Sequence, residues 1–476
     1  MADNAGIAGN TGDIGATVDL AILGGGSGGY AAALRAAELG RSVVLVEKDK
    51  VGGTCLHRGC IPTKALLHAG EIADQARESA QFGVNATFEG IDMGGVHKYK
   101  DGVVDKNHKG LVGLIKSRGI TIIEGEGRLT GPQQLSVGDT TYTAKNIILA
   151  TGSYSRTLPG LELDGGRVIA SEHALQLDHV PSSAIVLGGG VIGVEFASAW
   201  RSFGTEVTIV EALPHLVPLE DEANSKLLER AFRRRGIGFK LNARFQRVEH
   251  TETGVRVFLE GGENLDAELL LVAVGRGPTS ANLGYEEAGI SIERGFVNVD
   301  EYCRTSVPGI YAVGDLVATR QAAHPQLAHV GFAEGIMVAE HIAGLPVVPI
   351  DYAGVPRITY SSPEVASVGL TEPQAVAKFG ADNIKTVTYD LSGNGRSAIL
   401  QTKGAVKLVA QADGPVLGVH IVGDRVGELI AEAQLIYNWE ALPSEVAQLI
   451  HPHPTQSEAI GEAHLLLAGK PLHVHD

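Results

Sequence analysis

The sequence predicts an α/β protein in which two Rossmann-like dinucleotide-binding domains are followed by a C-terminal α+β domain. Three observations lead to this fold class. A strand, glycine turn, helix and strand pattern occurs twice, glycine supplies 62 of the 476 residues, and the texture of the sequence changes near residue 351. The glycine content is nearly double the usual share of about 7%, which indicates many tight turns and close backbone approaches.

The duplicated pattern organises the N-terminal half of the chain. The segments VDLAILGGGSGGYAAALRAAELGRSVVLVEKD and SSAIVLGGGVIGVEFASAWRSFGTEVTIVEAL both place GxGxxG directly after an apolar strand and at the start of a helix. Both end the next strand on an acidic residue. The matching residues, offset by 164 positions, are Gly24, Gly26, Gly29 and Glu47 in the first copy and Gly188, Gly190, Gly193 and Glu211 in the second.

These glycines and acidic residues suit the binding of a dinucleotide. The first glycine permits a tight turn, the second lets the backbone approach a pyrophosphate, and the third lets helix and strand pack closely. The helix N-terminus then faces the phosphates, and the acidic residue lies at about the spacing expected for a ribose-hydroxyl binder. Glycine turns without a ligand are the alternative, but the doubled context favours two dinucleotide sites.

Glu211 also indicates which nicotinamide coenzyme binds at the second site. A carboxylate at this strand end accepts hydrogen bonds from a free 2′-hydroxyl and repels a 2′-phosphate. The segment from Glu211 to Asp221 contains no lysine or arginine that would bind such a phosphate. The sequence therefore predicts NAD(H) rather than NADP(H).

Further apolar strands and a change of texture give the domain limits. AKNIILATGS, AELLLVAVGRGP and VPGIYAVGDL each predict a buried strand that ends in a glycine turn. AVKLVAQADGPVLGVHIVG predicts β-hairpins and VGELIAEAQLIYNWEAL an amphipathic helix. We expect a small N-terminal tail (1–17), an FAD-binding domain (18–155), an NAD-binding domain (156–275), a segment returning to the FAD domain (276–350) and an interface domain (351–476).

Bulk composition excludes several classes of function. The net charge of −16 argues against nucleic acid and anionic membranes as partners. No apolar run approaches the roughly 18 residues of a bilayer span, and the first residues lack the features of a signal peptide. Three cysteines in 476 residues, with no such leader, predict a cytoplasmic protein in which a cysteine pair is catalytic or metal-binding rather than structural.

Two of the cysteines, Cys55 and Cys60, lie in GGTCLHRGCIPTKALL. A metal site, a pair of inert buried cysteines and a redox-active disulfide are the three interpretations, and a metal site would need more ligands than lie nearby. In a regular helix these Cα atoms would be about 8.7 Å apart, beyond the roughly 6.8 Å limit of a disulfide. We therefore expect an irregular turn over Cys55–Cys60, with a regular helix only from Thr63 onward.

The position of the cysteine pair assigns the two dinucleotides. Cys55 comes eight residues after Glu47, so the pair lies beside the first site, where a redox-active dinucleotide would meet the sulfurs. A flavin exchanges hydride with NAD(H) and electron pairs with a disulfide, which places FAD at the first site and NAD at the second. Thiol chemistry also needs a base, and HPHPTQSEAIGEAH supplies candidates: His451, His453, Glu458 and His464. Spacing alone does not choose between His451 and His453.

These motifs resemble those of the pyridine-nucleotide disulfide oxidoreductases, and specifically the dihydrolipoamide dehydrogenase family, over nearly the whole chain from about Val18. The resemblance is carried by GGTCLHRGCIPTKALL, followed in order by ATGS, VGRGP, AVGD and HPHPTQSE. It implies that Cys55 is the interchange thiol and Cys60 the thiol against the flavin. It further implies that His453 is the base, oriented by Glu458, and that it reaches the cysteines of the other subunit of a homodimer.

The resemblance also implies a set of cofactor contacts and a partner. Lys64 would lie near the flavin and pair with Glu195, Asp315 would bind the ribityl chain, and the backbone at Ala328 and His329 would bind the flavin ring. Further cofactor contacts are implied at Gly127, Val248 and Gly275. The expected partner is a lipoyl-bearing acyltransferase, and no metal is expected.

The sequence departs from the family at two positions, and some rivals stay open. His57 stands where asparagine is more frequent, and Pro452 stands where alanine is common. Because His57 lies between the two thiols, it is a weaker alternative to His453 as the base. A reductase of another low-molecular-weight disulfide is the main rival enzyme, and a diaphorase or a non-catalytic subunit are the others. Cys303, in VDEYCRTS, has no cysteine nearby in the sequence and is expected to be a buried packing residue.

Overall fold

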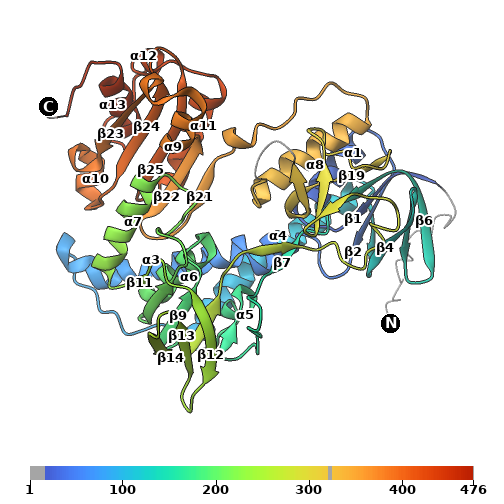
Figure 1. The fold of residues 1–476 in the computed structure, drawn as a ribbon, viewed down its shortest axis with the longest axis horizontal. Coiled ribbons are helices and arrows are strands. Elements are labelled where there is room, and N and C mark those ends of the chain that lie inside the picture. Colours follow the sequence, from blue (N-terminus) through green and yellow to red (C-terminus); the bar gives the residue numbers. More distant parts are fainter. Residues whose placement is uncertain (1–16, 320–323, 475–476) are drawn as a thin grey trace, which may run out of the picture. The chain divides into compact units, whose positions relative to one another are not determined.

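The computed structural model describes residues 17–319 and 324–474, so all but the last residue of the expected N-terminal tail lies outside the described residues. The chain forms two compact units (Figure 1). The first holds the described residues of Met1–Cys60, Val104–Tyr154 and Arg276–Tyr352. The second holds Ile61–Val103, Ser155–Gly275 and the described residues from Ala353. Residues 61–103 thus group with the second unit, and the domain limits expected from the sequence stay a prediction.

The first unit is built on a seven-stranded sheet in the order β3-β2-β1-β6-β5-β4, with β19 pairing with β6. β6 serves two ladders, because its first half pairs antiparallel with β5 and its second half parallel with β1. The strands are β1 (Val18–Leu23), β2 (Val43–Glu47), β3 (Thr121–Glu124), β4 (Gly127–Gly131), β5 (Gln134–Val137), β6 (Thr140–Leu149) and β19 (Ile310–Ala312).

Both faces of the parallel part of this sheet are covered, which explains its continuous apolar strands. Leu20 and Ile22 pack on one face, below helices α1 (Ser27–Glu38) and α8 (Ala328–Ile342), which lie side by side in Figure 1. Ala21 and Leu23 pack on the other face. That face meets a three-stranded sheet of β17 (Ile292–Glu293), β18 (Phe296–Val299) and β20 (Val317–Thr319).

The second unit contains a parallel sheet of the same type, in the order β11-β10-β9-β15-β8. Helices cover one face, and an antiparallel three-stranded sheet covers the other. The parallel strands are β8 (Val168–Ile169), β9 (Ser183–Leu187), β10 (Glu206–Val210), β11 (Gly238–Lys240) and β15 (Leu269–Val272). The helices are α3 (Cys60–Glu78), α5 (Ser171–Ala174), α6 (Val191–Phe203) and α7 (Glu222–Arg235), and the antiparallel strands are β12 (Phe245–His250), β13 (Val255–Leu259) and β14 (Asn264–Ala267).

The C-terminal part of the second unit is an antiparallel sheet in the order β21-β22-β25-β24-β23, packed against helices. The fold class expected from the sequence is therefore confirmed. The strands are β21 (Arg357–Thr359), β22 (Glu364–Gly369), β23 (Ile384–Asp390), β24 (Ala405–Gln411) and β25 (Val416–Gly423). The helices are α9 (Glu372–Phe379), α10 (Gly395–Leu400), α11 (Val426–Asn438), α12 (Pro443–Val446) and α13 (Glu458–Leu467).

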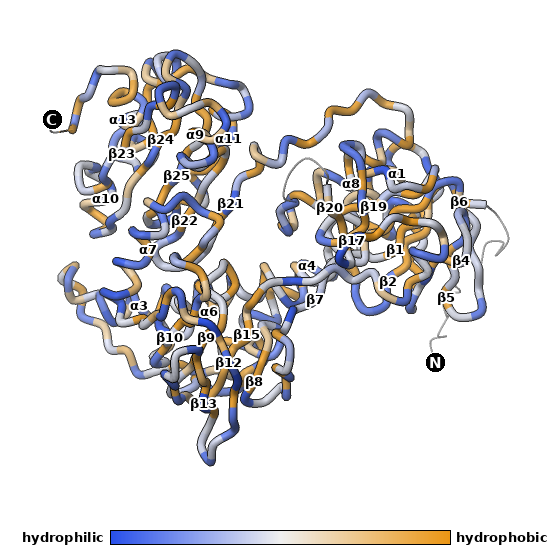
Figure 2. The backbone as a smooth tube through the Cα atoms, in the orientation of Figure 1, coloured by the Kyte–Doolittle hydropathy of each residue, from blue (hydrophilic) through white to orange (hydrophobic). Residues whose placement is uncertain are grey.

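A long helix and a further pair of strands also belong to the fold. Helix α4 (Met93–Ser117) runs from residues of the second unit to residues of the first, and β7 (Ser153–Ser155) pairs with β16 (Arg276–Pro278). Figure 2 shows the central strands of each sheet, such as β1 and β15, in hydrophobic colours, in agreement with their burial. None of the helices in the described part of the chain has both the length and the hydropathy of a membrane span.

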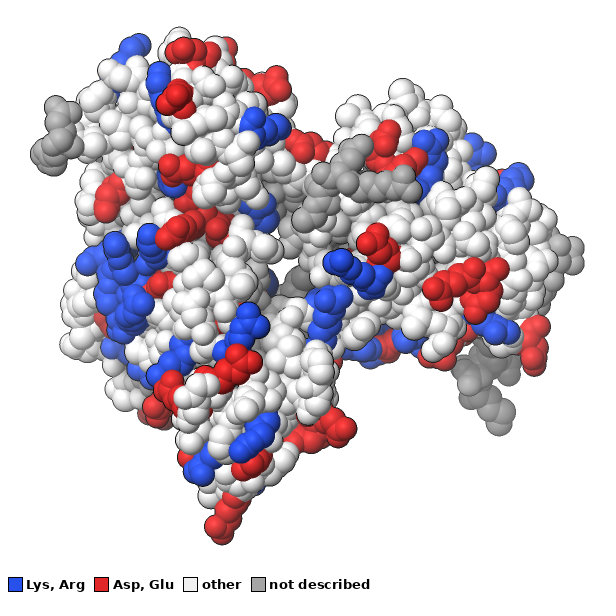
Figure 3. All heavy atoms as spheres, viewed as in Figure 1, with Lys and Arg blue, Asp and Glu red and all other residues white. Residues whose placement is uncertain are grey.

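Helix α7 illustrates how local sequence sets helix ends and surface charge. Asp221 caps its N-terminus by accepting a hydrogen bond from the backbone N–H of Ala223, and Gly236 ends the helix with φ at +75°. Its last turn carries Arg233, Arg234 and Arg235, the charge that the C-terminal end of a helix dipole favours. In Figure 3, Lys and Arg side chains gather over the region in which Figure 1 places α7.

Candidate active site

The first glycine turn has the geometry that a dinucleotide phosphate requires. Gly24 has φ at +106°, and a Cβ atom there would collide with the carbonyl oxygen of Ala150. A Cβ at Gly29 would collide with the carbonyl oxygen of Gly24, so helix α1 packs closely against the turn. Gly26 is different, because a Cβ there would meet nothing within 4 Å. The open space lies at the N-terminus of α1, which is where the phosphates of FAD would bind.

Glu47, at the end of β2, closes this turn. Its two carboxylate oxygens accept hydrogen bonds from the backbone N–H groups of Gly25 (2.7 Å) and Asp49 (2.9 Å). Burial raises the pKa of Glu47, although the hydrogen bond from the backbone N–H of Gly25 opposes the rise. Gly127 begins β4, and its Cα packs so tightly on the ends of β1 and β2 that a Cβ would lie 2.7 Å from Leu23 Cδ1. Gly127 therefore lies beside the carboxyl ends of these strands, while its contact with FAD stays a prediction.

The second glycine turn repeats the first. Gly188 has φ at +111° and faces the carbonyl oxygen of Ala273, and a Cβ at Gly193 would collide with Gly188. Gly190 again faces open space, at the N-terminus of α6. Two turns of the same backbone geometry, each with open space at the middle glycine, fit the phosphates of two dinucleotides.

Glu211 holds the second turn as Glu47 holds the first. Its oxygens accept hydrogen bonds from the N–H groups of Gly189 (2.6 Å) and Leu213 (2.8 Å), and the residue is 8% exposed. Gly275 follows β15 with φ at +110°, and a Cβ there would meet nothing within 4 Å. Val248 lies on β12 and packs in the cluster that contains the ends of β9 and β15. The cofactor contacts of Val248 and Gly275 stay predictions.

The cysteine segment differs in detail from the expectation. Residues Gly53–Arg58 form the short helix α2, so Cys55 is helical, and a second helix, α3, begins at Cys60 rather than at Thr63. The chain breaks only at Gly59, whose φ of −144° and ψ of −109° lie outside the helical region. The expected irregularity is therefore confined to one residue, because glycine tolerates a backbone conformation that ends one helix and starts another. Both cysteines are half-buried.

Two side chains lie near the cysteines, and of these only Tyr30 was not anticipated from the sequence. Tyr30, on α1, has a pKa raised to about 12, first by burial and then by the nearby thiols of Cys55 and Cys60. His57, on α2, has Nε2 3.0 Å from the carbonyl oxygen of Val51 and its ring centroid 5.0 Å from that of His108. The Nε2 nitrogen of His57 therefore has a backbone partner.

The ion pair expected between Lys64 and Glu195 is present. Lys64 Nζ, on α3, lies 2.9 and 2.8 Å from the two carboxylate oxygens of Glu195 on α6. Glu195 is 3% exposed and also accepts a hydrogen bond from the backbone N–H of Tyr360, while Lys64 Nζ lies 4.7 Å from the centre of the Tyr360 ring. No sequence pattern pointed to Tyr360, since it joins the pair only through the fold. The place of Lys64 near a flavin stays a prediction.

Asp315 follows β19 in the short 3-10 helix η2 (Gly314–Leu316). Ser153 Oγ donates to Asp315 Oδ2 at 2.5 Å, and Arg276 Nε donates to Ser153 Oγ at 2.7 Å. Ser153 and Arg276 belong to ATGS and VGRGP, so the motifs were recognised, but their mutual contact was not. Ala328 and His329 begin α8, and their backbone contacts to a flavin stay a prediction.

The C-terminal histidine and carboxylate form the expected dyad. His453 Nδ1 lies 2.7 Å from Glu458 Oε1, and the backbone N–H of Thr455 donates to Glu458 Oε2 at 2.7 Å. Burial opposes ionisation of Glu458, but these two hydrogen bonds outweigh it, so the pKa of Glu458 lies below its usual value. The His453 side chain is 76% exposed, and its role as a base stays a prediction.

The neighbouring histidines have other environments. His451 Nε2 lies 2.7 Å from Glu432 Oε1, and this hydrogen bond raises the pKa of His451. His464 is fully buried on α13, and burial lowers its pKa to about 4. The two histidines between which spacing did not choose differ in exposure, because the side chain of His453 is 76% exposed and that of His451 is 12% exposed. Which of them acts as a base stays a prediction.

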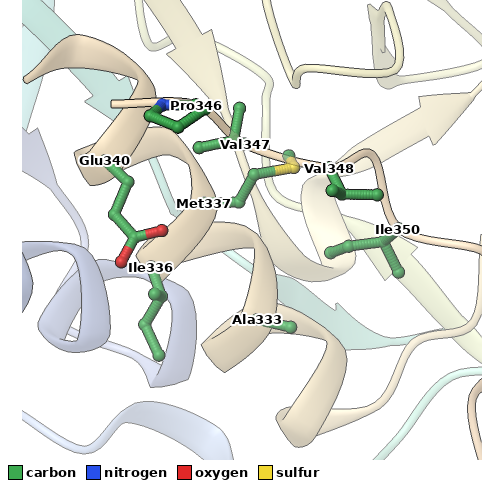
Figure 4. Close-up of a pocket in the computed structure, with 8 residues that line it drawn as sticks. All are labelled: Ala333, Ile336, Met337, Glu340, Pro346, Val347, Val348 and Ile350. Atoms are coloured by element: carbon green, nitrogen blue, oxygen red, sulfur yellow. The ribbon is translucent and has the colours of Figure 1, made fainter. Parts of the chain in front are cut away.

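Besides the expected site residues, the candidate features to consider are a groove beside α8, the buried thiol of Cys303 and any cluster of metal ligands. A groove of about 310 Å³ lies between α8 and residues 346–350. It is lined by apolar side chains such as Ile336, Val348 and Ile350, with one carboxylate, Glu340 (Figure 4). Cys303 is buried, as expected, and burial raises its pKa well above the usual value. Within residues 17–319 and 324–474, no three His, Cys, Asp or Glu side chains gather as metal ligands.

Comparison with known proteins agrees with this geometry. The chain matches the family model of the pyridine nucleotide-disulphide oxidoreductases over residues 18–335 and the dimerisation domain of that family over residues 355–464. A dihydrolipoyl dehydrogenase of Bacillus subtilis is 42% identical over 475 residues, which cover 96% of this chain and 99% of the relative.

Two solved structures are also similar. LpdA from Mycobacterium tuberculosis superposes with a TM-score of 0.87 at 28% identity, over 95% of this chain and 100% of that one. The HOCl-induced flavoprotein disulfide reductase RclA from Escherichia coli gives 0.83 at 29% identity, over 94% of this chain and 99% of that one. The chain thus belongs to the pyridine nucleotide-disulphide oxidoreductase family, whose dimerisation domain it carries, and it uses FAD and NAD.

Proposed function

We propose that the chain is a dihydrolipoyl dehydrogenase, which converts a dihydrolipoyl group and NAD⁺ into a lipoyl disulfide, NADH and a proton. The observation that carries the proposal is the 42% identity to the Bacillus subtilis dihydrolipoyl dehydrogenase over almost the full length of both chains. The two matching glycine turns, the cysteine pair and the His453–Glu458 dyad supply the groups that this reaction needs.

The cofactors and the cysteines divide the chemistry. FAD, when bound, accepts an electron pair from the reduced cysteines and passes it to NAD⁺. Gly26 and Glu47 would hold FAD, and Gly190 and Glu211 would hold NAD, because each pair combines open space at a helix N-terminus with a carboxylate at a strand end.

The thiol steps fall to Cys55 and Cys60. A substrate thiolate attacks Cys55 Sγ of the oxidised pair, the Cys55–Cys60 bond breaks, and Cys60 leaves as a thiolate. The second substrate thiolate then attacks the substrate sulfur bound to Cys55, which closes the lipoyl disulfide and releases Cys55 as a thiolate. The two substrate protons leave, and the two electrons that the substrate loses reside on the cysteine pair.

His453 is proposed to accept the substrate protons. Its Nδ1 is fixed by Glu458, so the exposed Nε2 is the nitrogen that takes a proton from a thiol, and the carboxylate stabilises the imidazolium that forms. In the proposed homodimer, His453 acts on the cysteine pair of the partner subunit, and residues 355–464 supply the contact surface. A lipoyl-bearing acyltransferase is the proposed protein substrate, and the low cysteine content supports a cytoplasmic location.

A side-by-side assay tests the proposal. Dihydrolipoamide with NAD⁺ is expected to turn over far faster than reduction of glutathione disulfide or a mycothiol-type disulfide with NADH or NADPH. Cys55→Ser is expected to abolish turnover of dihydrolipoamide while FAD stays bound. A higher kcat/KM for a low-molecular-weight disulfide than for lipoamide would instead favour the rival reductase, a disulfide reductase in the sense in which RclA of Escherichia coli is named.

A further inference from the structure

Glu334, in the middle of helix α8, is a buried carboxylate to which the sequence assigned no role. It is 0% exposed. Its oxygens accept three hydrogen bonds: from the backbone N–H of Gly314 (2.6 Å), from Nε2 of His324 (2.7 Å) and from the hydroxyl of Tyr352 (2.6 Å). The three donors come from three separate segments of the first unit, so one side chain joins all of them.

The environments of Tyr352 and His324 keep a hydrogen on the atom through which each donates to Glu334. Burial, and then the charge of Glu334, raises the pKa of Tyr352 far above its usual value, so the hydroxyl keeps its proton. The His324 side chain is 4% exposed, and its Nδ1 is buried without a hydrogen-bond partner among the described residues. The tautomer with hydrogen on Nε2 therefore serves Glu334 and leaves no buried N–H unpaired. Burying a charged group costs free energy unless hydrogen bonds replace those to water, and the three donors supply such hydrogen bonds to the carboxylate of Glu334.

What Glu334 holds in place is the turn that carries Asp315. Gly314, whose N–H it accepts, has φ at +76° and immediately precedes Asp315. Asp315 is fixed on its other side by Ser153, and its carbonyl oxygen accepts a hydrogen bond from the Gln326 side chain at 3.3 Å. Because Glu334 belongs to α8, its bond to Gly314 also fixes the distance between this turn and the start of α8.

We propose that Glu334 is a positioning residue for FAD, which holds the Gly314–Asp315 turn in register with the first turn of α8. The inference rests on the proposed binding of FAD by Asp315 and by the backbone at Ala328 and His329. Glu334 acts on the turn through the backbone N–H of Gly314, and Tyr352 and His324 keep its carboxylate in place.

The test is the rate at which the holoprotein releases FAD, followed by the rise of flavin fluorescence after dilution. Glu334→Ala is expected to release FAD at least about tenfold faster, since a charge-assisted hydrogen bond to the turn is lost. Glu334→Gln is expected to recover most of this loss, because its amide oxygen still accepts from Gly314. The visible circular dichroism of bound flavin should change in Glu334→Ala and return in Glu334→Gln.

Two further variants keep the test decisive. Tyr352→Phe removes one donor without touching the helix and is expected to speed release by about threefold, which decides the matter if Glu334→Ala does not fold. Glu340→Gln is the matched control, because it removes a carboxylate from the same helix that pairs with Arg35 instead, and its release rate should equal that of the unaltered protein. Far-UV circular dichroism in parallel separates release from unfolding.

The outcomes separate this inference from the assignment on which it rests. If Glu334→Ala and Tyr352→Phe release FAD no faster than Glu340→Gln, the positioning role is refuted. If Asp315→Ala also leaves FAD release unchanged, the proposed binding role of Asp315 fails with it. Faster release in Asp315→Ala with no effect in the Glu334 and Tyr352 variants refutes the inference alone.

Discussion

Glu364→Gln is expected to stabilise the second unit above pH 7. Glu364 begins β22, and its Oε2 accepts a hydrogen bond from the backbone N–H of Gly427 at 2.8 Å. Burial raises the pKa of Glu364 to about 7, and the nearby carboxylates of Asp424, Glu428 and Glu71 add to the rise, against the opposing hydrogen bond from Gly427. Glutamine has nearly the same shape, keeps an oxygen for Gly427 and never becomes charged.

The magnitude follows from the displaced pKa. Because the folded protein holds the proton of Glu364 up to about pH 7 while the unfolded chain releases it near 4.5, stability is lost as the pH rises through this window. At about 1.36 kcal/mol for each pH unit the loss is about 3 kcal/mol, which partial exposure of the side chain reduces to about 2 kcal/mol. Glu364→Gln should therefore match the unaltered protein near pH 4.5 and exceed its stability by about 2 kcal/mol at pH 8.

Urea unfolding of the holoprotein between pH 5 and pH 8 measures this difference. The two tryptophans, Trp200 and Trp439, both lie in the second unit, so their fluorescence reports its unfolding. Glu252→Gln, at an exposed carboxyl in the turn between β12 and β13, is the control and should leave the pH dependence unchanged. An unaltered pH dependence in Glu364→Gln, or a loss of stability at pH 8, would refute the reasoning.

Three other predictions concern the proposed reaction and the packing of the second unit. His453→Ala should lower turnover of dihydrolipoamide by at least about 100-fold and spare electron transfer from NADH to a dye; equal loss of both activities would contradict the role of His453. Glu211→Arg should raise the ratio of kcat/KM for NADP(H) over NAD(H), and an unchanged ratio would count against the role of Glu211. Lys407→Met should destabilise the second unit by about 3 kcal/mol, because Lys407 Nζ lies 2.8 Å from the carboxylate of Asp221, which is 2% exposed. The exposed Lys385→Met is the control, and equal urea midpoints for both lysine variants would refute this prediction.

Local chemistry made the glycine turns predictable from the sequence. Gly24 and Gly188 need positive φ, and Gly29 and Gly193 leave no room for a side chain. The spacing of these glycines in the sequence therefore predicts the conformation of both turns. The dyad of His453 and Glu458 was expected only because of the family resemblance, since spacing alone did not choose between His451 and His453. The irregularity between Cys55 and Cys60 was expected from helix geometry, although its confinement to Gly59 was not, since one glycine is enough to separate two helices.

Contacts between residues far apart in the chain could not be predicted from the sequence. Tyr360 meets Glu195 across 165 positions and Ser153 meets Asp315 across 162, and no periodicity or spacing encodes such pairs. The pair of Lys64 and Glu195, 131 positions apart, was expected only because of the family resemblance.

The sequence by itself determined the two dinucleotide folds, the cysteine pair and the acidic residue at each strand end, because these depend on short stretches whose backbone conformations follow from residue type. The tertiary structure alone decided which polar side chains are buried and what satisfies them. Glu334 is the clearest case: its sequence neighbours on α8 do not distinguish it from the partly exposed Glu340 on the same helix. Only the packing of three other segments against α8 turns one of these carboxylates into a buried acceptor of three hydrogen bonds.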